Sequence, residues 1–263
     1  RGAGGVSEDI ITGKCIAELV QEKLAACLLL DIEPDTDAAD ARQLMSALTD
    51  ADFVVSVSSY NSASVKKVAD VMLPAASFME TSGTYVNAEG YWQSFKGVVN
   101  PKGEARPAWK ILRVLGNLTG VDGFDYLSSE NIRSEVRSSC EGIELSNALS
   151  GAAEVTATVA DGLFRASDVP MYACDAVVRR SAPLQQTVDA QSLCVRINSA
   201  QADSLGIGAA ASVNVRQGEN SAVLPLVIDD SIPDASVWIP SAVEVSDKLG
   251  AAFAEVSIEG AAG

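Results

Sequence analysis

The sequence has 263 residues, with 19 Lys and Arg against 35 Asp and Glu and a net charge of −16. Such a charge repels nucleic acid and anionic membrane surfaces, so neither is an expected partner. The sequence contains no histidine, which excludes Ser-His-Asp, Cys-His and zinc-hydrolase chemistry within this chain. Its longest apolar run, Leu24 to Leu30, is far shorter than the roughly 20 residues that cross a bilayer. We therefore expect no direct membrane insertion.

Strands alternate with helices in the first part of the chain. Helices are expected over Ser7–Lys23, Ala38–Leu48 and Ala63–Ala69. Strands buried on both faces are expected over Leu24–Ile32 and Phe53–Val57, and a further strand over Val71–Leu73. This alternation predicts βαβ units and a Rossmann-like parallel sheet.

A loop is expected over Tyr85–Asn100. Pro107 then starts a helix whose apolar stripe ends at Gly120, and helical sequence continues to about Cys140. The Ala-, Ser- and Gly-rich stretch Glu141–Ala160 is typical of a linker. The sequence therefore predicts an α/β domain over 1–150.

Short alternating β-runs punctuated by turn residues follow the linker: Val195–Ile197, Val213–Val215, Val223–Ile228 and Val237–Ile239. One short helix is expected over Ser199–Leu205, with Asn198 as its cap. This pattern predicts a second, β-rich domain over 151–263.

An acidic loop after the first predicted strand carries five carboxylates: Asp31, Glu33, Asp35, Asp37 and Asp40. It lacks the glycine at position six and the terminal glutamate of an EF-hand. Open α/β folds hold their ligands after such strands, which raises the alternative of a cation site only slightly. We expect a solvated loop, with a calcium or magnesium site as the alternative.

Two other groups of residues have the chemistry to contact a ligand. Arg179 and Arg180 present planar donor forks that suit a carboxylate on a neighbouring protein or a phosphate, although solvation at the surface is the commoner state. Gly2, Gly4 and Gly5 precede a helix but follow no strand, so they do not form a dinucleotide fingerprint.

Five cysteines are scattered along the chain without a Cys-x-x-Cys pair: Cys15, Cys27, Cys140, Cys174 and Cys194. Zinc and iron–sulfur centres need closely spaced thiolates, because a short loop must present several ligands to one centre. The odd, dispersed count also argues against a disulfide framework and fits a reducing cytoplasm. We therefore expect no catalytic, cofactor-binding or metal-binding residues here.

The segment Ala69–Leu112 orders a buried strand, a Pro stop, a Gly-Thr turn, an Asn-x-Glu-Gly loop and a Pro-started helix. It resembles the molybdopterin-oxidoreductase superfamily, and within it looks most like the large iron–sulfur subunits of bacterial NADH-quinone oxidoreductase (respiratory complex I). Val195–Gln217 resembles the signature of the superfamily's C-terminal barrel, which implies a double-psi barrel-like domain. Val169–Thr187 is similar to a stretch of some of these bacterial iron–sulfur subunits.

Polar side chains in the loop of this motif are Glu80, Asn87, Glu89 and Gln93. We interpret the loop as a structural cap of the sheet. Tyr91 stands where the superfamily usually has arginine, which removes a cation that would pair with phosphate.

The resemblance implies a C-terminal scaffold portion of the large iron–sulfur subunit, which belongs to an NADH:quinone oxidoreductase but is non-catalytic alone. It implies iron–sulfur clusters in an N-terminal part upstream of Arg1, and we interpret the chain, which begins without Met and shows no signal peptide, as a piece of that longer protein. The implied partners are other peripheral-arm subunits of complex I. The implied location is the cytoplasmic side of the bacterial inner membrane.

The alternative is the cofactor-binding C-terminal half of a molybdopterin-dependent oxidoreductase, such as a formate dehydrogenase or nitrate reductase. The lack of histidine argues against it, as do the three alanines Ala209–Ala211 where the superfamily usually has a Gly-Asp turn. A stand-alone α/β module for a small ligand would explain the βαβ pattern but not the Ala69–Leu112 motif.

Overall fold

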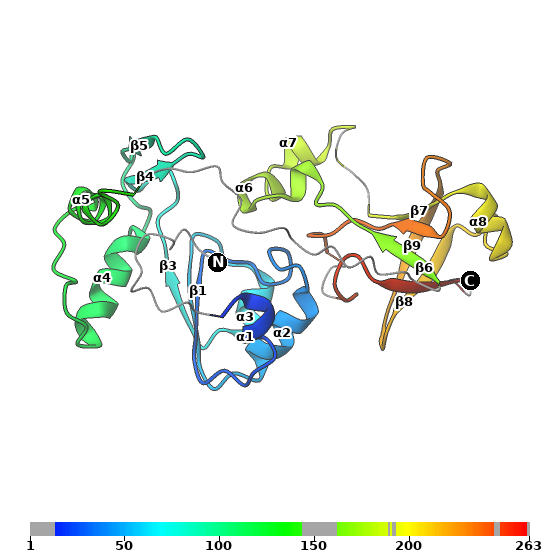
Figure 1. Cartoon of the computed structure of the whole chain (residues 1–263), viewed down its shortest axis with the longest axis horizontal. Helices are drawn as coiled ribbons and strands as arrows, with labels where there is room; N and C mark the ends of the chain where they lie inside the picture. Colours follow the sequence, from blue (N-terminus) through cyan, green and yellow to red (C-terminus); the bar gives the residue numbers. More distant parts are fainter. Residues whose placement is uncertain (1–13, 144–161, 189, 191–192, 245–247, 262–263) are drawn as a thin grey trace. The chain divides into compact units, whose positions relative to one another are not determined.

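A computed structural model describes residues 14–143, 162–188, 190, 193–244 and 248–261 (Figure 1). The chain divides into two compact units. The first comprises Arg1–Asp31, Ala51–Asn61 and Ala69–Val155, and the second comprises Ile32–Asp50, Ser62–Val68 and Thr156–Gly263. Two short stretches from the first half of the sequence, Ile32–Asp50 and Ser62–Val68, thus belong to the second unit. The domain boundary after residue 150 stays a prediction, and most of the expected linker, from 144 to 160, lies outside the described residues.

The first unit contains a three-stranded parallel sheet in the order β1-β2-β3. β1 (Cys27–Leu30) pairs with β2 (Val54–Ser58), which pairs with β3 (Val71–Pro74). Parallel neighbours need crossover connections, and in the sequence these contain α2 (Ala41–Thr49) and α3 (Ala63–Val68). The predicted alternation of strands and helices and the parallel sheet are confirmed.

Burial differs between the central strand and its neighbour. Val54 and Val57 of β2 are fully buried, whereas Leu28 and Leu30 of β1 are 49% and 45% exposed. The prediction that β1 is buried on both faces is therefore wrong, because β1 is an edge strand of the described sheet. Before it, the described residues contain only the short α1 (Ile16–Leu19) of the longer helix expected there.

A β-hairpin occupies most of the stretch expected to be a loop. β4 (Gly83–Val86) pairs antiparallel with β5 (Trp92–Phe95) as a separate two-stranded sheet. Aromatic and β-branched residues suit both strands. The turn is made by Asn87, whose side-chain oxygen accepts from two backbone N–H groups, and by Gly90, which has a φ of +81°. The loop prediction is therefore wrong over these strands.

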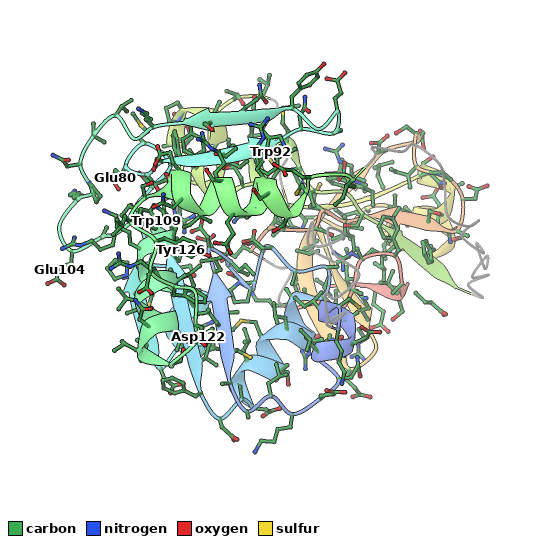
Figure 2. The ribbon with its side chains drawn as sticks, turned by 60° about the vertical axis from the view of Figure 1, so that its left-hand side comes forward. Glu80, Trp92, Glu104, Trp109, Asp122 and Tyr126 are labelled. Carbon is green, nitrogen blue, oxygen red and sulfur yellow. The ribbon has the colours of Figure 1, made fainter. Side chains whose placement is uncertain are left out.

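Two helices follow the hairpin in the same unit. α4 (Ala108–Leu118) begins after Pro107, as predicted, and Gly120 follows its end with a φ of +71°. α5 (Ser129–Ser139) is capped by Ser128 and runs beside the hairpin, where Arg133 Nη1 donates to Ser94 Oγ at 2.9 Å (Figure 2).

The second unit contains a closed β-barrel with the strand order β10-β6-β11-β8-β9-β7. Most of its core is apolar: Val195, Ile197, Val213, Val215, Val237 and Ile239 are fully buried. The strands are β6 (Leu163–Ala166), β7 (Val195–Ile197), β8 (Ser212–Gln217), β9 (Asn220–Ile228), β10 (Ser236–Trp238) and β11 (Glu255–Gly260).

The predicted barrel is confirmed at this level, and its double-psi arrangement stays a prediction. Helix α8 (Ser199–Ser204) begins at Asn198, whose side chain accepts from the N–H of Gln201, as its predicted cap should. Between β6 and β7 lie the 3₁₀ turn η1 (Met171–Ala173) and two short helices, α6 (Ala176–Arg179) and α7 (Ala182–Gln185). Among the helices of the described residues, none is long and apolar enough to span a membrane.

Candidate functional site

Glu33 is the most deeply buried carboxylate of the acidic loop that follows β1. Only 6% of this residue is exposed. Its backbone N–H donates to Asp37 Oδ2 at 2.8 Å, and its carbonyl accepts from the N–H of Thr36 at 3.0 Å. A buried carboxylate is unfavourable unless a cation or several donors pair with it. The expectation of a solvated loop is therefore wrong at Glu33.

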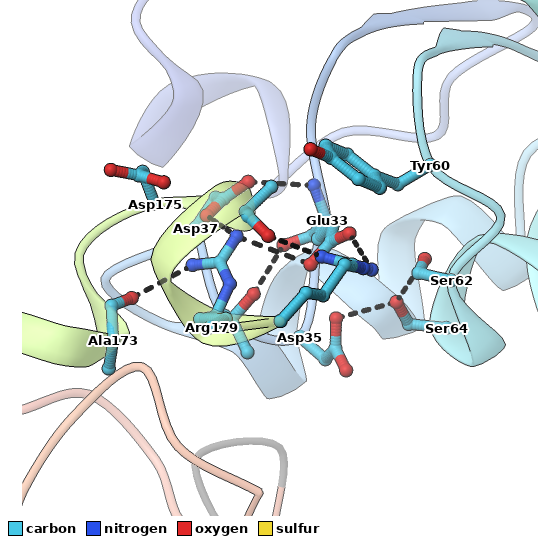
Figure 3. A network of polar contacts seen from close by, with 12 residues as sticks. Glu33, Asp35, Asp37, Tyr60, Ser62, Ser64, Ala173, Asp175 and Arg179 are labelled. Atoms are coloured by element: carbon cyan, nitrogen blue, oxygen red, sulfur yellow. Dashed lines mark hydrogen bonds and ion pairs between the residues drawn. The ribbon is translucent and has the colours of Figure 1, made fainter. Parts of the chain in front are cut away.

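Two consecutive arginines at the end of α6 pair with this carboxylate (Figure 3). Arg179 Nη2 lies 3.2 Å from Glu33 Oε2 and 2.9 Å from Asp37 Oδ1, while its Nη1 donates to the carbonyl of Ala173 at 3.0 Å. Arg180 Nη2 pairs with the second oxygen of Glu33. The Arg179 side chain is only 13% exposed, so the expectation of solvated arginines is wrong there. All these residues belong to the second unit.

The other carboxylates of the acidic loop also bind groups of the protein. Asp35 accepts from the hydroxyl of Ser64, and Asp40 caps α2 by accepting from the backbone N–H three residues on. In the first unit, Asp31 accepts from the N–H of Ser59 at 3.1 Å. Within the described residues, no group of three His, Cys, Asp or Glu is arranged to hold a metal ion. The loop is thus a set of caps and ion pairs.

Glu80 of the Ala69–Leu112 motif joins two segments of backbone. Its Oε2 accepts from the N–H of Ser77 at 3.0 Å, and its Oε1 accepts from the N–H of Lys102 at 3.1 Å. The other motif residues build the hairpin: Asn87 bonds the N–H of Glu89 and Tyr91 in the turn, and Gln93 lies opposite Tyr85 in the ladder. The side chains of Glu80 and Asn87 therefore hold the local backbone in place.

A shallow hollow of about 440 Å³ lies beside Glu80 and the first turn of α4. Figure 2 labels two residues of its lining, Glu80 and Trp109. Two cations line it, Arg106 and Lys110, and Lys110 Nζ lies 5.3 Å from the centre of the Trp109 ring. Cations beside an aromatic ring attract carboxylates and other anions. Both oxygens of Glu80, the carboxylate on the wall of this hollow, already accept backbone N–H groups. The hollow thus offers anion attraction without a general base.

The five cysteines are all free thiols. Cys194 is buried, and desolvation raises the pKa of its thiol while nearby Arg196 opposes that shift. Desolvation also raises the pKa of Cys27. A raised pKa lowers the thiolate fraction and hence nucleophilicity. Cys174 is the exposed member of the set.

Arg165 of β6 is a buried charge that the sequence reasoning missed. It is 1% exposed and lies in the barrel, where Nη1 donates to Gln217 Oε1 at 3.2 Å and to the Gly250 carbonyl at 3.1 Å. Its Nη2 donates to the Pro240 carbonyl at 3.4 Å, and desolvation lowers its pKa. The available signal was its two-residue spacing from Leu163, which places both side chains on the inner face of one strand.

Comparison with known sequences finds a family model that matches the first part of the chain. Residues 6–118 match the family Molybdopterin oxidoreductase. The chain is 30% identical over 117 residues to a nitrate reductase of Shewanella frigidimarina, covering 44% of this chain and 12% of that protein. It is 33% identical over 130 residues to an F420-dependent formate dehydrogenase subunit alpha of Methanocaldococcus jannaschii, covering 48% of this chain and 19% of that protein.

A shorter but more similar match is to the NADH-ubiquinone oxidoreductase 78 kDa subunit of Candida albicans. The identity is 53% over 47 residues, covering 18% of this chain and 6% of that protein. Among solved structures, acetylene hydratase from Pelobacter acetylenicus has a TM-score of 0.53 at 14% identity, covering 85% of this chain and 38% of that chain. This likeness shows the fold alone. The chain spans less than a fifth of the length of these three curated relatives.

Proposed function

We propose that this chain, which contains a molybdopterin oxidoreductase family domain over residues 6–118, is the C-terminal scaffold portion of the large iron–sulfur subunit of a bacterial NADH-quinone oxidoreductase. In this proposal the intact subunit carries iron–sulfur clusters upstream of Arg1 and passes electrons from NADH toward quinone. The present chain holds no redox centre of its own. It contacts other peripheral-arm subunits on the cytoplasmic side of the inner membrane.

The observation that carries the proposal is the level of local identity. The match to the 78 kDa subunit of NADH-ubiquinone oxidoreductase reaches 53%, compared with 33% for the formate dehydrogenase subunit and 30% for the nitrate reductase. The higher identity, which extends over 47 residues, favours a relative of the respiratory subunit.

The ion pairs of the acidic loop support a scaffold. Open α/β sheets hold their ligands in the loops after their strands, and here the loop after β1 presents Glu33 and Asp37 to Arg179. The guanidinium groups that would pair with the phosphates of a pterin dinucleotide are already paired with these carboxylates. Three further carboxylates, Asp31, Asp35 and Asp40, belong to the same loop. This set of residues does not fit a dinucleotide phosphate.

The second candidate is the cofactor-binding half of a molybdopterin-dependent oxidoreductase. The longer matches favour it, since the formate dehydrogenase and nitrate reductase relatives align over 130 and 117 residues, against 47 for the respiratory protein. The two candidates differ in metal content. The scaffold should contain no molybdenum, whereas the enzyme half should hold it in stoichiometric amounts.

Elemental analysis tests this difference after expression in a host that makes the molybdenum cofactor. Anaerobic reconstitution with iron and sulfide, followed by a visible spectrum and an NADH assay with an artificial acceptor, tests for a redox centre. We expect no molybdenum, no charge-transfer band and no turnover. Co-expression with bacterial peripheral-arm subunits should give a stable complex. Stoichiometric molybdenum in the purified protein, or its failure to bind those subunits, would overturn the proposed scaffold role.

A further inference from the structure

One face of the hairpin β4–β5 exposes aromatic rings. Side chains alternate between the two faces of a strand, so Gly83, Tyr85, Gln93 and Phe95 share this face, and Thr84, Val86, Trp92 and Ser94 share the other. The second face lies next to α5, because Ser94 Oγ accepts from Arg133 there and also bonds Thr84 Oγ1 at 3.0 Å. The face with the Tyr85 and Phe95 rings is therefore the one turned away from α5.

A groove of about 490 Å³ runs along this face. It is lined by Phe78, Met79, Tyr85, Phe95, Val98 and Lys96. Tyr85 and Phe95 stack with ring centres 5.4 Å apart, and the Phe95 ring covers Gly83 so closely that an added Cβ there would lie 2.7 Å from it. The backbone N–H of Val98 donates to the Met79 carbonyl at 2.8 Å, which fixes the side of the groove away from the hairpin. The groove is thus built by defined contacts.

Four of the lining side chains are largely exposed: Phe78 at 61%, Met79 at 47%, Tyr85 at 69% and Val98 at 74%. Burying one such side chain against a partner would contribute about 1.5–3 kcal/mol to the free energy of binding. Contiguous apolar surface of this kind marks interaction sites in proteins. A two-stranded sheet is also marginal alone, and in the described residues each hairpin strand has one edge without a strand partner.

The charge around the groove selects the partner. Lys96 is the charged residue of the lining, and residues 75–113 carry five basic against three acidic residues in a chain of net charge −16. The lining contains Lys96 and no carboxylate, so a twofold pair of copies joined through the groove would bring two cations into the interface without a counter-charge from the lining. An anionic membrane would be repelled by the chain as a whole. A polypeptide with apolar side chains and a carboxylate near Lys96 would match both the apolar lining and the positive charge of the groove.

We infer that this groove binds an extended segment of a partner protein that alternates aliphatic and acidic residues. Its aliphatic side chains enter between Phe78, Tyr85 and Val98, and one carboxylate pairs with Lys96. The inference uses the proposed scaffold role only in choosing a protein as the occupant, and its test is independent of metal content and NADH oxidation.

The test uses the full chain and two fluorescein-labelled octapeptides. One alternates leucine or valine with aspartate, and the other carries lysine at each aspartate position. Fluorescence anisotropy should show binding of the acidic peptide that Tyr85→Ser and Val98→Ser each weaken by roughly tenfold or more, because each removes one buried side chain. Lys96→Glu should weaken the acidic peptide and strengthen the basic one.

Matched controls are Leu127→Ser, since Leu127 is 86% exposed and does not line the groove, and Lys102→Glu, which makes the same charge change outside it. Both should bind the acidic peptide as the unmodified chain does. Equal binding by every variant would overturn the inference. The inference would also be overturned if the unmodified chain dimerised with rising concentration and Val98→Ser did not. The same holds if the unmodified chain bound phosphatidylcholine–phosphatidylglycerol vesicles and Val98→Ser did not.

Discussion

Arg179 Nη2 lies 3.2 Å from Glu33 Oε2, although the two residues are 146 positions apart in the chain. Glu33 belongs to the loop after the first strand of the parallel sheet, whereas Arg179 ends a short helix that follows the first strand of the barrel. The pair therefore joins the two halves of the sequence within one compact unit. Both side chains are mostly buried, so little solvent screens their attraction.

Glu33→Gln should lower the free energy of unfolding by about 3 kcal/mol, because it leaves two guanidinium groups next to a neutral amide in a mostly buried site. Chemical denaturation measures this loss. Asp52→Asn is the matched control, since its ion pair with Lys23 is 62% and 70% exposed and such pairs contribute less than about 1 kcal/mol. Equal losses in the two variants would contradict a structural role for the Glu33 pairs.

Gly116→Ala in α4 should destabilise the protein by about 1–2 kcal/mol. Alanine in a helix is normally favoured over glycine by about 1 kcal/mol, but an added Cβ at position 116 would overlap the ring of Phe124, and overpacking costs about 1–3 kcal/mol. The steric effect should win. Thermal unfolding measures the result, and the double variant with Phe124→Leu should recover part of the loss. A more stable Gly116→Ala protein would mean that the ring moves aside freely.

Arg165→Ala should lower the free energy of unfolding by about 3–5 kcal/mol. It opens a cavity in the barrel and removes the N–H groups that donate to Gln217 Oε1 and to the carbonyls of Gly250 and Pro240. Arg165→Lys should recover less than half of that loss, since an ammonium group cannot reproduce the planar fork. Arg165→Met keeps the length without the donors. If the methionine variant unfolds at the same denaturant concentration as the parent, the buried arginine contributes no net stability.

Cys194 should react slowly with a disulfide reagent while Cys174 reacts quickly, because Cys194 is 2% exposed with a raised pKa and Cys174 is exposed. In the unfolded chain a thiol ionises near its ordinary pKa of about 8.5, whereas in the folded chain Cys194 stays protonated to higher pH. Its contribution to stability is therefore constant below about pH 8.5 and is lost as the pH rises further.

Denaturation midpoints at pH 7 and pH 10 measure this loss, and Cys194→Ala should be less sensitive to pH than the parent. Labelling followed by peptide mapping identifies which thiol reacted. Fast labelling of Cys194 at pH 7 would show that the barrel opens readily.

The sequence allowed the parallel sheet to be predicted because Val54 and Val57 lie in a mostly apolar run of the kind that buried strands need. Asn198 likewise signals the start of α8 through local chemistry. The hairpin was missed because its strands are four residues each and Tyr85 and Phe95 lie close to the turn and loop residues around them. The ion pairs of Glu33 could not be predicted, since they depend on which distant cations the fold brings near.

The barrel places its last strand between two earlier ones: β11 pairs with β6 on one side and with β8 on the other. The ring of backbone hydrogen bonds therefore stays open until Glu255–Gly260 has left the ribosome. Synthesis proceeds at about 5–20 residues per second, so β6 waits several seconds for its antiparallel neighbour. During that interval β6 and β8 expose unpaired edges, which are templates for pairing with other chains.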